Sequence, residues 1–382
     1  MTAPAFWRGR RVLVTGHTGF KGSWLSLWLQ GLGADVTGLA LAPPTSPSLF
    51  ALARVGDGMT SVEGDIRDIA TVRSVMAECA PEVVFHLAAQ PLVLESYRDP
   101  VASYATNVMG TVHVLDAVRA TPGVRAVVNV TTDKCYANRE WTWGYREVDR
   151  LGGDDPYSSS KACAELVAAA MRASYFPAAR YAEHGVSLAS VRAGNVIGGG
   201  DWAANRLVPD LLAAFAAGRP AVLRRPDAIR PWQHVLDPLA GYLALAERLV
   251  QDGPSWGEAW NFGPADHGAQ PVRWVADRLS GAWGPTACWT IDDAGSSAST
   301  TIAGNAAGAS PHETHVLTLD SAKARQRLRW MPRLDLDAAI RWTADWHRAY
   351  VRRDDMRDVT RAQLHAYGAL PAMIPSNAVS CP

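Results

Sequence analysis

The N-terminal segment constrains the fold most strongly, because an apolar run leads directly into a glycine-rich turn and then into a helical pattern. The run RRVLVTG carries β-branched residues typical of a buried strand. Glycines follow at Gly16, Gly19 and Gly22. Such a turn leaves backbone N–H groups at a helix N-terminus, where no Cβ blocks an approaching pyrophosphate. Glycines placed only for close packing give the same pattern, so the motif by itself leaves both interpretations open.

Alternating strands and helices follow this turn through the first half of the chain. Between the strand-like runs, apolar residues recur at the three-and-four spacing of amphipathic helices. This alternation predicts an α/β fold with a Rossmann-type, doubly wound parallel sheet, and it favours the nucleotide-binding interpretation of the turn. The predicted strands are RRVLVTG, ADVTGLAL, MTSVEGD, EVVFHLAA, VRAVVNVTT and VSLASVRAG.

The regular alternation fades after about residue 195, where loops rich in Gly, Pro and Trp separate helical patterns. We therefore predict a Rossmann domain at 1–194. At 195–382 we predict a smaller C-terminal lobe that mainly binds substrate, with some segments returning to the Rossmann domain. Segment 294–310 has little bulky apolar content, and we interpret it as a mobile surface loop. Helices in this half are predicted at 206–217, 237–251, 271–281, 320–328 and 335–351.

The charge balance and the cysteines exclude several classes of protein. Lys+Arg and Asp+Glu both number 37, so no basic excess indicates nucleic acid, and any bound anion must be held by a local cluster of donors. The five cysteines form no C-x-x-C pair, and neither a signal peptide nor a long apolar span is present. We expect a cytoplasmic protein with reduced thiols and no membrane contact. The ten histidines show no H-E-x-x-H motif, so we expect no metal.

The segment PYSSSK carries a second chemical signal. Tyr157 and Lys161 are four residues apart and therefore share one face of a helix. A lysine ammonium there can lower the pKa of the phenol and make it a usable base near neutrality. Many exposed helices produce this spacing by chance, so the preceding glycine turn is what favours a catalytic pair.

Several longer motifs together resemble the extended short-chain dehydrogenase/reductase family, and within it the 4,6-dehydratases that act on CDP-glucose. Related dTDP-sugar dehydratases carry an Asp-Glu pair where this chain has Asp133 and Lys134, which favours the cytidine enzymes. The resemblance implies NAD as cofactor, CDP-glucose as substrate and a lyase that removes water. The motifs are TGHTGFKG, VEGDIRD, HLAAQP, TTDKCYAN, YSSSKACAE, RAGNVIGGGDW, RLVPDLL and RPWQHVLDPLAGYL.

The resemblance also implies roles for individual catalytic residues. Tyr157, assisted by Lys161, corresponds to the base that removes the C4 hydroxyl proton, and Thr132 to a hydroxyl beside it. Asp133 is expected to protonate the departing C6 hydroxyl, with Lys134 a weaker candidate for the C5 base. An adjacent Asp and Lys after a strand is more often a surface ion pair. Their position at the carboxyl end of a central parallel strand favours the active site.

The cofactor residues are expected on the first strands and their turns. Asp65 corresponds to a residue that contacts the adenine of the cofactor in this family. Alternatively, Asp65 could be the N-cap of the helix that follows. No acidic residue lies near Ala42 to bind the adenosine ribose, so the choice of NAD over NADP rests on the resemblance. The implied cofactor residues are Gly16, Thr18, Gly19, Phe20, Gly22, Asp65, Ile66, Leu87, Ala88 and Ala89, with Tyr157 and Lys161.

Substrate recognition is expected in the C-terminal lobe, where arginines suit a nucleotide diphosphate. Trp202, Trp232 and His234 could equally fill the core of that lobe. Asn107 matches an asparagine that shapes the central helix around the catalytic lysine, with a helix cap or an interhelical hydrogen bond as the alternative. The implied substrate residues are Asn195, Arg206, Leu207, Arg230, Trp232 and His234.

Two other functions and the assembly remain open at this level. A 4-epimerase of the same family needs Tyr157 and Lys161 but does not need Asp133 and Lys134. A cofactor-sensing binding module on this scaffold is expected to lack that tyrosine or lysine. The helices NVMGTVHVLDAVRA and YSSSKACAELV resemble a pair that forms a four-helix dimer interface, so we expect a homodimer or tetramer, although their apolar faces could pack entirely within one chain.

Overall fold

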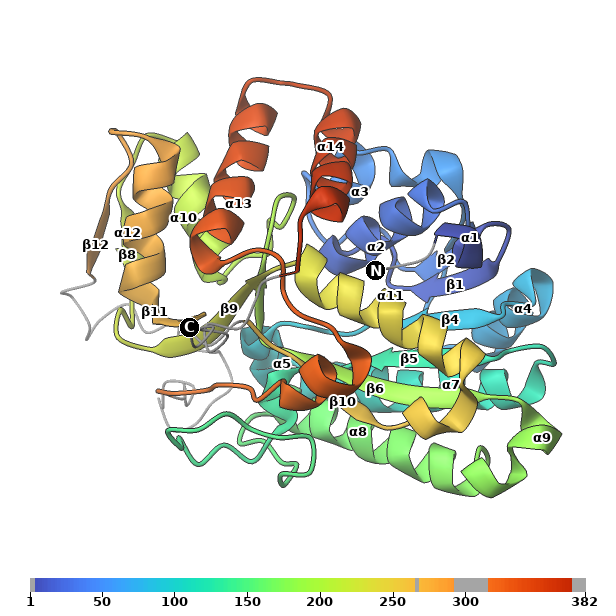
Figure 1. The fold of residues 1–382 in the computed structure, drawn as a ribbon. Helices are drawn as coiled ribbons and strands as arrows, with labels where there is room; N and C mark the ends of the chain where they lie inside the picture. Colours follow the sequence, from blue (N-terminus) through green and yellow to red (C-terminus); the bar gives the residue numbers. More distant parts are fainter. Residues whose placement is uncertain (1–3, 265–267, 292–314, 373–382) are drawn as a thin grey trace, which may run out of the picture.

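A seven-stranded parallel sheet forms the centre of the protein (Figure 1). The computed structural model describes residues 4–264, 268–291 and 315–372, so segment 294–310 lies outside the described residues. The strand order β10-β6-β5-β4-β1-β2-β3 confirms the predicted doubly wound fold. The strands are β1 (Arg11–Thr15), β2 (Asp35–Ala40), β3 (Thr60–Glu63), β4 (Val83–His86), β5 (Ala126–Val130), β6 (Ser187–Ala193) and β10 (Ala259–Phe262).

Helices cover both faces of this sheet, which explains why its strands are apolar on both sides. Val12 and Val14 of β1 face the cluster that contains α2 (Phe20–Gly31) and α11 (Leu236–Gln251). Leu13, between them, faces the opposite cluster. The helices of that second face are α4 (Ile69–Cys79), α7 (Gly110–Ala120) and α8 (Pro156–Ser174). The helices expected between the strands are thus confirmed.

The C-terminal lobe has its own core and small sheets. A three-stranded sheet joins β7 (Asn195–Ile197), β9 (Ile229–His234) and β11 (Ala269–Pro271), and a two-stranded sheet joins β8 (Ala221–Leu223) and β12 (Trp289–Ile291). The predicted helices appear as α10 (Leu207–Ala216), α11, α12 (Val272–Trp283) and α13 (Leu336–Val351), whereas the 320–328 segment contains the π-helix η6 (Ala324–Leu328).

Parts of the second half of the chain lie on the main sheet. Strand β10 pairs with β6 in parallel, and the buried leucines of α11 belong to the main core. Helix α14 (Met356–Ala369), which we did not predict, places Tyr367 edge-on against Trp28 of α2. The division at residues 194 and 195 stays a prediction. Within the described ranges, no helix combines the length and apolar character that crossing a membrane requires.

A buried ion pair links the sheet to α8. Arg192 of β6 donates from Nε and Nη2 to the two carboxylate oxygens of Glu165 on α8, each over 2.9 Å, and both side chains are only 3% exposed. The hydroxyl of Thr131, which follows β5, donates to the same carboxylate. Arg192 Nη1 also donates to the Tyr136 hydroxyl over 2.8 Å. One ion pair therefore fixes the relative positions of α8, β6 and the segment after β5.

Replacing Arg192 with Met should destabilise the protein by about 3–5 kcal/mol, because the Glu165 carboxylate would remain buried without its partner. Urea unfolding of the variant measures this loss. The matched control is the double variant Arg192→Met with Glu165→Gln, which removes both charges and should recover much of the stability. An equal loss in the single and double variants would contradict this explanation.

Candidate active site

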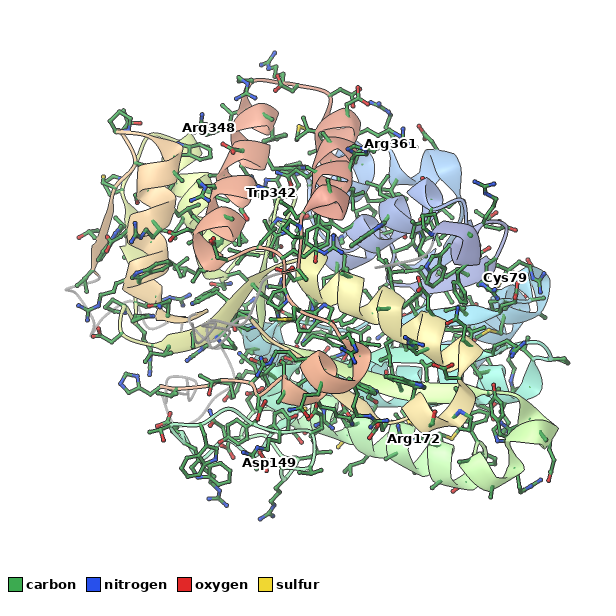
Figure 2. The ribbon with its side chains drawn as sticks, viewed as in Figure 1. Cys79, Asp149, Arg172, Trp342, Arg348 and Arg361 are labelled. Atoms are coloured by element: carbon green, nitrogen blue, oxygen red, sulfur yellow. The ribbon has the colours of Figure 1, made fainter. Side chains whose placement is uncertain are left out.

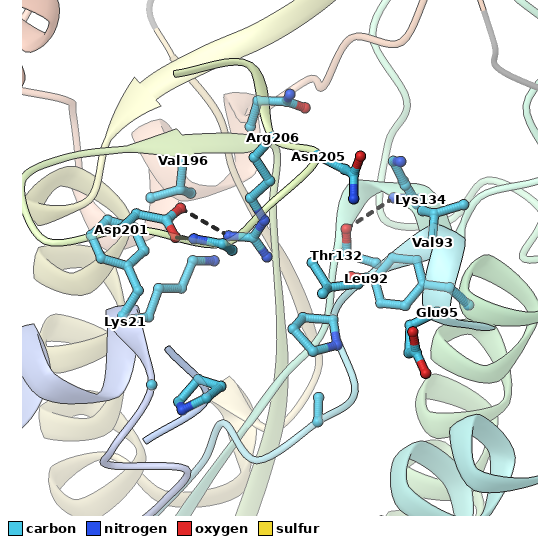
Figure 3. Close-up of a pocket in the computed structure, with 18 of the residues that line it drawn as sticks. Lys21, Leu92, Val93, Glu95, Thr132, Lys134, Val196, Asp201, Asn205 and Arg206 are labelled. Carbon is cyan, nitrogen blue, oxygen red and sulfur yellow. Dashed lines mark hydrogen bonds and ion pairs between the residues drawn. The ribbon is translucent and has the colours of Figure 1, made fainter. Parts of the chain in front are cut away.

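One large cavity of about 1270 Å³ opens at the carboxyl ends of the central strands (Figure 3). Its walls come from the turn after β1, the segments that follow β4 and β5, the start of α8 and the C-terminal lobe. Ligand sites of small molecules usually have about 300–1000 Å³, so this cavity has room for more than one ligand. It lies where open α/β sheets bind their ligands.

The glycine turn forms one wall of the cavity, and close packing requires its glycines. Gly16 has φ +76°, and a Cβ on it would lie 2.7 Å from the backbone nitrogen of Ala88. A Cβ on Gly22 would overlap the carbonyl oxygen of Gly16. Helix α2 then begins at Phe20 with Gly19 as an N-cap that offers no side-chain acceptor, so its first N–H groups face the cavity without a cap. These donors fit a pyrophosphate.

The remaining residues expected to contact the cofactor also line the cavity. The Thr15 hydroxyl accepts hydrogen bonds from the backbone N–H groups of Leu87 and Ala88, each over 3.2 Å, and so holds the segment after β4 against the glycine turn. Asp65 is not the N-cap of α4, because Asp68 holds that position and accepts from Ala70 N. The residues of this set on the cavity wall are Thr18, Phe20, Asp65, Ile66, Leu87, Ala88 and Ala89.

The five predicted catalytic residues line this same cavity. Thr132 ends the segment after β5 and caps the short 3₁₀-helix η3 (Asp133–Cys135), accepting from Lys134 N over 3.3 Å. Tyr157 and Lys161 lie on the first two turns of α8, which Asp155 caps. Two elements that are 20 residues or more apart in sequence therefore bring the tyrosine and the aspartate to one site.

Asp133 has the properties of a proton donor. The residue is 2% exposed, and burial raises the pKa of its carboxyl group against the opposing effects of Lys134, Thr132, Arg230 and Lys21. Its Oδ1 accepts from the Thr132 hydroxyl over 3.0 Å, whereas Oδ2 has no hydrogen-bond partner among the described residues. Because a raised pKa favours the neutral acid, Asp133 can hold a proton in the cavity.

Tyr157 and Lys161 interact less directly than their spacing suggests. Burial raises the pKa of Tyr157 to about 12, and a hydrogen bond with Thr132 and the charge of Arg206 partly oppose this rise. Lys161 donates from Nζ to the carbonyl oxygen of Val130 over 3.3 Å, and burial lowers its pKa to about 8. Our expectation that Lys161 would bring the pKa of the phenol toward neutrality is wrong for this structure, because burial dominates and Lys161 is not among the groups that lower this pKa.

Asn107 positions the helix that carries Lys161. It lies in the π-helix η2 (Ala105–Met109), and its Nδ2 donates to the Ser160 hydroxyl on α8 over 2.9 Å. Its Oδ1 accepts from Gln90 N over 2.8 Å. The asparagine thus joins the central helix to α8 through a buried interhelical hydrogen bond.

Most of the predicted substrate residues reach the cavity from the C-terminal lobe. Arg206 precedes α10 and pairs with Asp201 at 3.1 Å, and the buried Arg230 donates to the carbonyl oxygen of Ile229 over 2.8 Å. Asn195, Leu207 and Trp232 are the other members that line it. Sequence reasoning missed eight cavity residues that carry charge, among them Glu95, Arg98, Asp154 and Asp155. The RRPD segment before Arg230 was a usable signal for two of the four others. These four are Lys21, Asp201, Arg224 and Arg225.

The prediction that His234 binds substrate is wrong. His234 is fully buried, and its ring packs edge-on against Trp24 of α2 and Trp342 of α13, which is labelled in Figure 2. The described residues that line the cavity do not include it. At the last position of β9, the imidazole therefore packs in the core between α2 and α13. Trp202 touches the cavity but packs edge-on against Trp346, His347 and Tyr350.

Comparison with known proteins identifies the family. The model of the NAD dependent epimerase/dehydratase family matches residues 12–263. The chain belongs to this family. A CDP-glucose 4,6-dehydratase of Salmonella typhimurium is 52% identical over 362 residues, which cover 95% of this chain and 97% of that protein. A dTDP-glucose 4,6-dehydratase of Streptomyces griseus is 34% identical over 62% of this chain and 70% of its own length.

Solved structures of the epimerase/dehydratase family share the fold. The UDP-glucose 4-epimerase of Thermus thermophilus, in complex with NAD, has a TM-score of 0.72 at 25% identity and covers 88% of this chain and 99% of its own. The dTDP-glucose 4,6-dehydratase of Bacillus anthracis, in complex with NAD, has a TM-score of 0.70 at 21% identity over 91% of this chain and 100% of its own. The predicted fold and family are therefore confirmed.

The glycine turn gives a testable consequence for NAD binding in this epimerase/dehydratase. Gly22→Ala should weaken NAD binding at least about tenfold, because the new Cβ would displace the Gly16 carbonyl and open the turn. Isothermal titration with NAD measures the affinity. Gly31→Ala is the matched control in the same helix, since nothing lies within 4 Å of its Cβ position. Unchanged NAD affinity in Gly22→Ala would contradict this role of the turn.

Proposed function

We propose that this protein is a CDP-glucose 4,6-dehydratase, an NAD-dependent hydro-lyase that converts CDP-D-glucose to CDP-4-keto-6-deoxy-D-glucose. The observation that carries the proposal is one cavity in which the phenol of Tyr157, the buried acid Asp133 and the glycine turn meet. The 52% identity to the CDP-glucose 4,6-dehydratase of Salmonella typhimurium, over nearly the full length of both chains, supports this choice of substrate.

The first half-reaction oxidises the sugar at C4. When bound at the glycine turn, NAD supplies a hydride acceptor and a positively charged ring. Tyr157 removes the proton of the C4 hydroxyl, and Thr132, which is hydrogen-bonded to the phenol, orients both groups. Because burial raises the pKa of Tyr157 to about 12, the phenol depends on the cations around it to release its own proton.

The second half-reaction removes water. The 4-keto group acidifies the C5 hydrogen, and Lys134 takes this proton while Asp133 protonates the C6 hydroxyl as it leaves. C6 would receive the hydride that bound NAD holds, and Lys134 protonates C5. The proton that Tyr157 gained replaces the one that Asp133 gave up, so the net change is the loss of one water. The buried Asp133, whose pKa burial raises, distinguishes this chemistry from epimerisation, which needs no acid beside C6.

The proposal extends to assembly and location. Three exposed apolar side chains lie on α6 (Pro100–Tyr104), η2 and α8, where the family resemblance puts a dimer interface. They are Val101, Met109 and Leu166, exposed by 78%, 48% and 57%. We propose a cytoplasmic homodimer, with pairing into a tetramer as the larger form; a 41.1 kDa particle in light scattering at micromolar protein would contradict it.

A mass-spectrometric screen of nucleotide-activated glucoses tests the proposed function directly. The enzyme, supplied with NAD, should convert CDP-glucose to a product lighter by one water that develops the absorbance of a 4-keto sugar in alkali. UDP-glucose and dTDP-glucose serve as matched substrates. Formation of an epimer of unchanged mass, or loss of water only from another nucleotide sugar, would refute the proposal.

Replacing Asp133 with Asn should separate the two half-reactions. The amide cannot donate the proton that the C6 hydroxyl needs, so elimination should slow by about 100-fold or more, whereas C4 oxidation should slow by less than about tenfold. Single-turnover measurements report oxidation as NADH absorbance and elimination as loss of water. Equal impairment of both steps would show that Asp133 is not the acid.

A further inference from the structure

Lysine is rare in this chain and concentrated at the active-site cavity. The sequence contains 33 arginines but only four lysines. Three of these lysines, Lys21, Lys134 and Lys161, line the cavity, compared with five of the 33 arginines. The fourth, Lys323, pairs with Glu258 outside it. Because arginine is the usual cation elsewhere in the chain, the cavity positions suit a compact charge whose pKa can shift. The proposed mechanism uses two of them and leaves Lys21 without a role.

Lys21 lies at the junction of the cofactor turn and the substrate side. It is the second residue of α2, directly after Phe20, at the electropositive end of that helix. Among the described residues, none forms a hydrogen bond or an ion pair with its ammonium group. Figure 3 shows this group directed toward the pair formed by Arg206 and Asp201, which belongs to the C-terminal lobe.

The electrostatic surroundings of Lys21 favour an anion beside it. Arg206 is its strongest charged neighbour, followed by Asp133, Lys161 and Asp201. Burial and the adjacent Arg206 lower the pKa of Lys21 to about 8, whereas Asp133 and Asp201 act in the opposite direction. Asp201 already pairs with Arg206, and burial raises the pKa of Asp133, which weakens it as a counter-charge. The side chains of Lys21 and Arg206 thus approach each other across the cavity with too little negative charge to balance them. An anionic group of a ligand would supply that charge.

We propose that Lys21 binds the diphosphate of the nucleotide-sugar substrate together with Arg206. The inference rests on the proposed function. It implies that the glycine turn binds both ligands: its backbone N–H groups bind the cofactor, and the side chain of Lys21 binds the substrate. Lysine binds phosphate as a point charge, and a glycine-rich turn is a favourable place for it. The charged neighbours of Lys21 include Arg206 and Asp133, and the proposed function puts both on the substrate side. They do not include Asp65, which lies where the adenine of the cofactor is expected. The diphosphate is therefore that of the substrate, not that of NAD.

Titration calorimetry with separate ligands tests the proposal without measuring turnover. CDP, cytidine and NAD are each titrated into the wild type and into the Lys21→Met, Lys21→Arg and Lys323→Met variants. Lys21→Met should bind CDP about tenfold more weakly while cytidine and NAD change by less than about twofold. Lys21→Arg keeps the charge and should recover most of the CDP affinity. Lys323→Met, which removes the lysine outside the cavity, should leave CDP binding unchanged.

Three results would overturn the inference. Loss of NAD affinity with unchanged CDP affinity in Lys21→Met would assign the lysine to the cofactor diphosphate. Unchanged affinity for both ligands would exclude Lys21 as a diphosphate ligand, and an equal loss for CDP and cytidine would point to an effect on the nucleoside. If the wild type binds UDP or dTDP in place of CDP, the proposed substrate fails instead, and the effect of Lys21→Met is then measured with that diphosphate and its nucleoside.

Discussion

The buried ion pair between Glu165 and Arg192 holds together the parts from which the site is made. Glu165 lies one turn beyond Lys161 on α8, and the carboxylate also accepts from Thr131, which immediately precedes Thr132. Charges this deeply buried are stable only when their hydrogen-bonding groups are satisfied, and the arginine achieves this with bonds to Glu165, to the Tyr136 hydroxyl and to the Glu147 carbonyl. The distance between the phenol of Tyr157 and the carboxyl group of Asp133 therefore depends on an ion pair that contacts neither of these two side chains.

Burial then determines how each titratable group in the cavity behaves. It raises the pKa of Asp133, which favours the neutral acid, and it lowers the pKa of Lys21 and of Lys161 to about 8. The same effect raises the pKa of Tyr157 to about 12. A carboxyl group with a raised pKa, lysines with lowered pKa values and a phenol that needs cations beside it suit oxidation followed by elimination.

The sequence predicted the fold well where patterns are long and buried, and less well elsewhere. Six of the seven central strands were recognised, and β4, β5 and β6 among them are buried along their whole length. The short β10 lies in a stretch rich in Gly and Trp, and α14 buries only Met356, Thr360 and Tyr367, so neither gave a pattern strong enough to identify. Spacing placed Tyr157 and Lys161 on one helix, but it could not show that the ammonium faces the Val130 carbonyl. His234 was misassigned because a motif does not reveal which side of a strand end faces a cavity. Lys21 was overlooked inside a motif that is usually interpreted through its glycines.

The central claim is that one cavity carries out oxidation, loss of water and reduction on the same sugar. The most direct measurement follows deuterium placed at C4 of CDP-glucose through turnover in ordinary water, with the product examined by NMR. The account predicts that the deuterium appears at C6 while C4 becomes the carbonyl carbon. Deuterium that remains at C4, or that is lost to water, would contradict it.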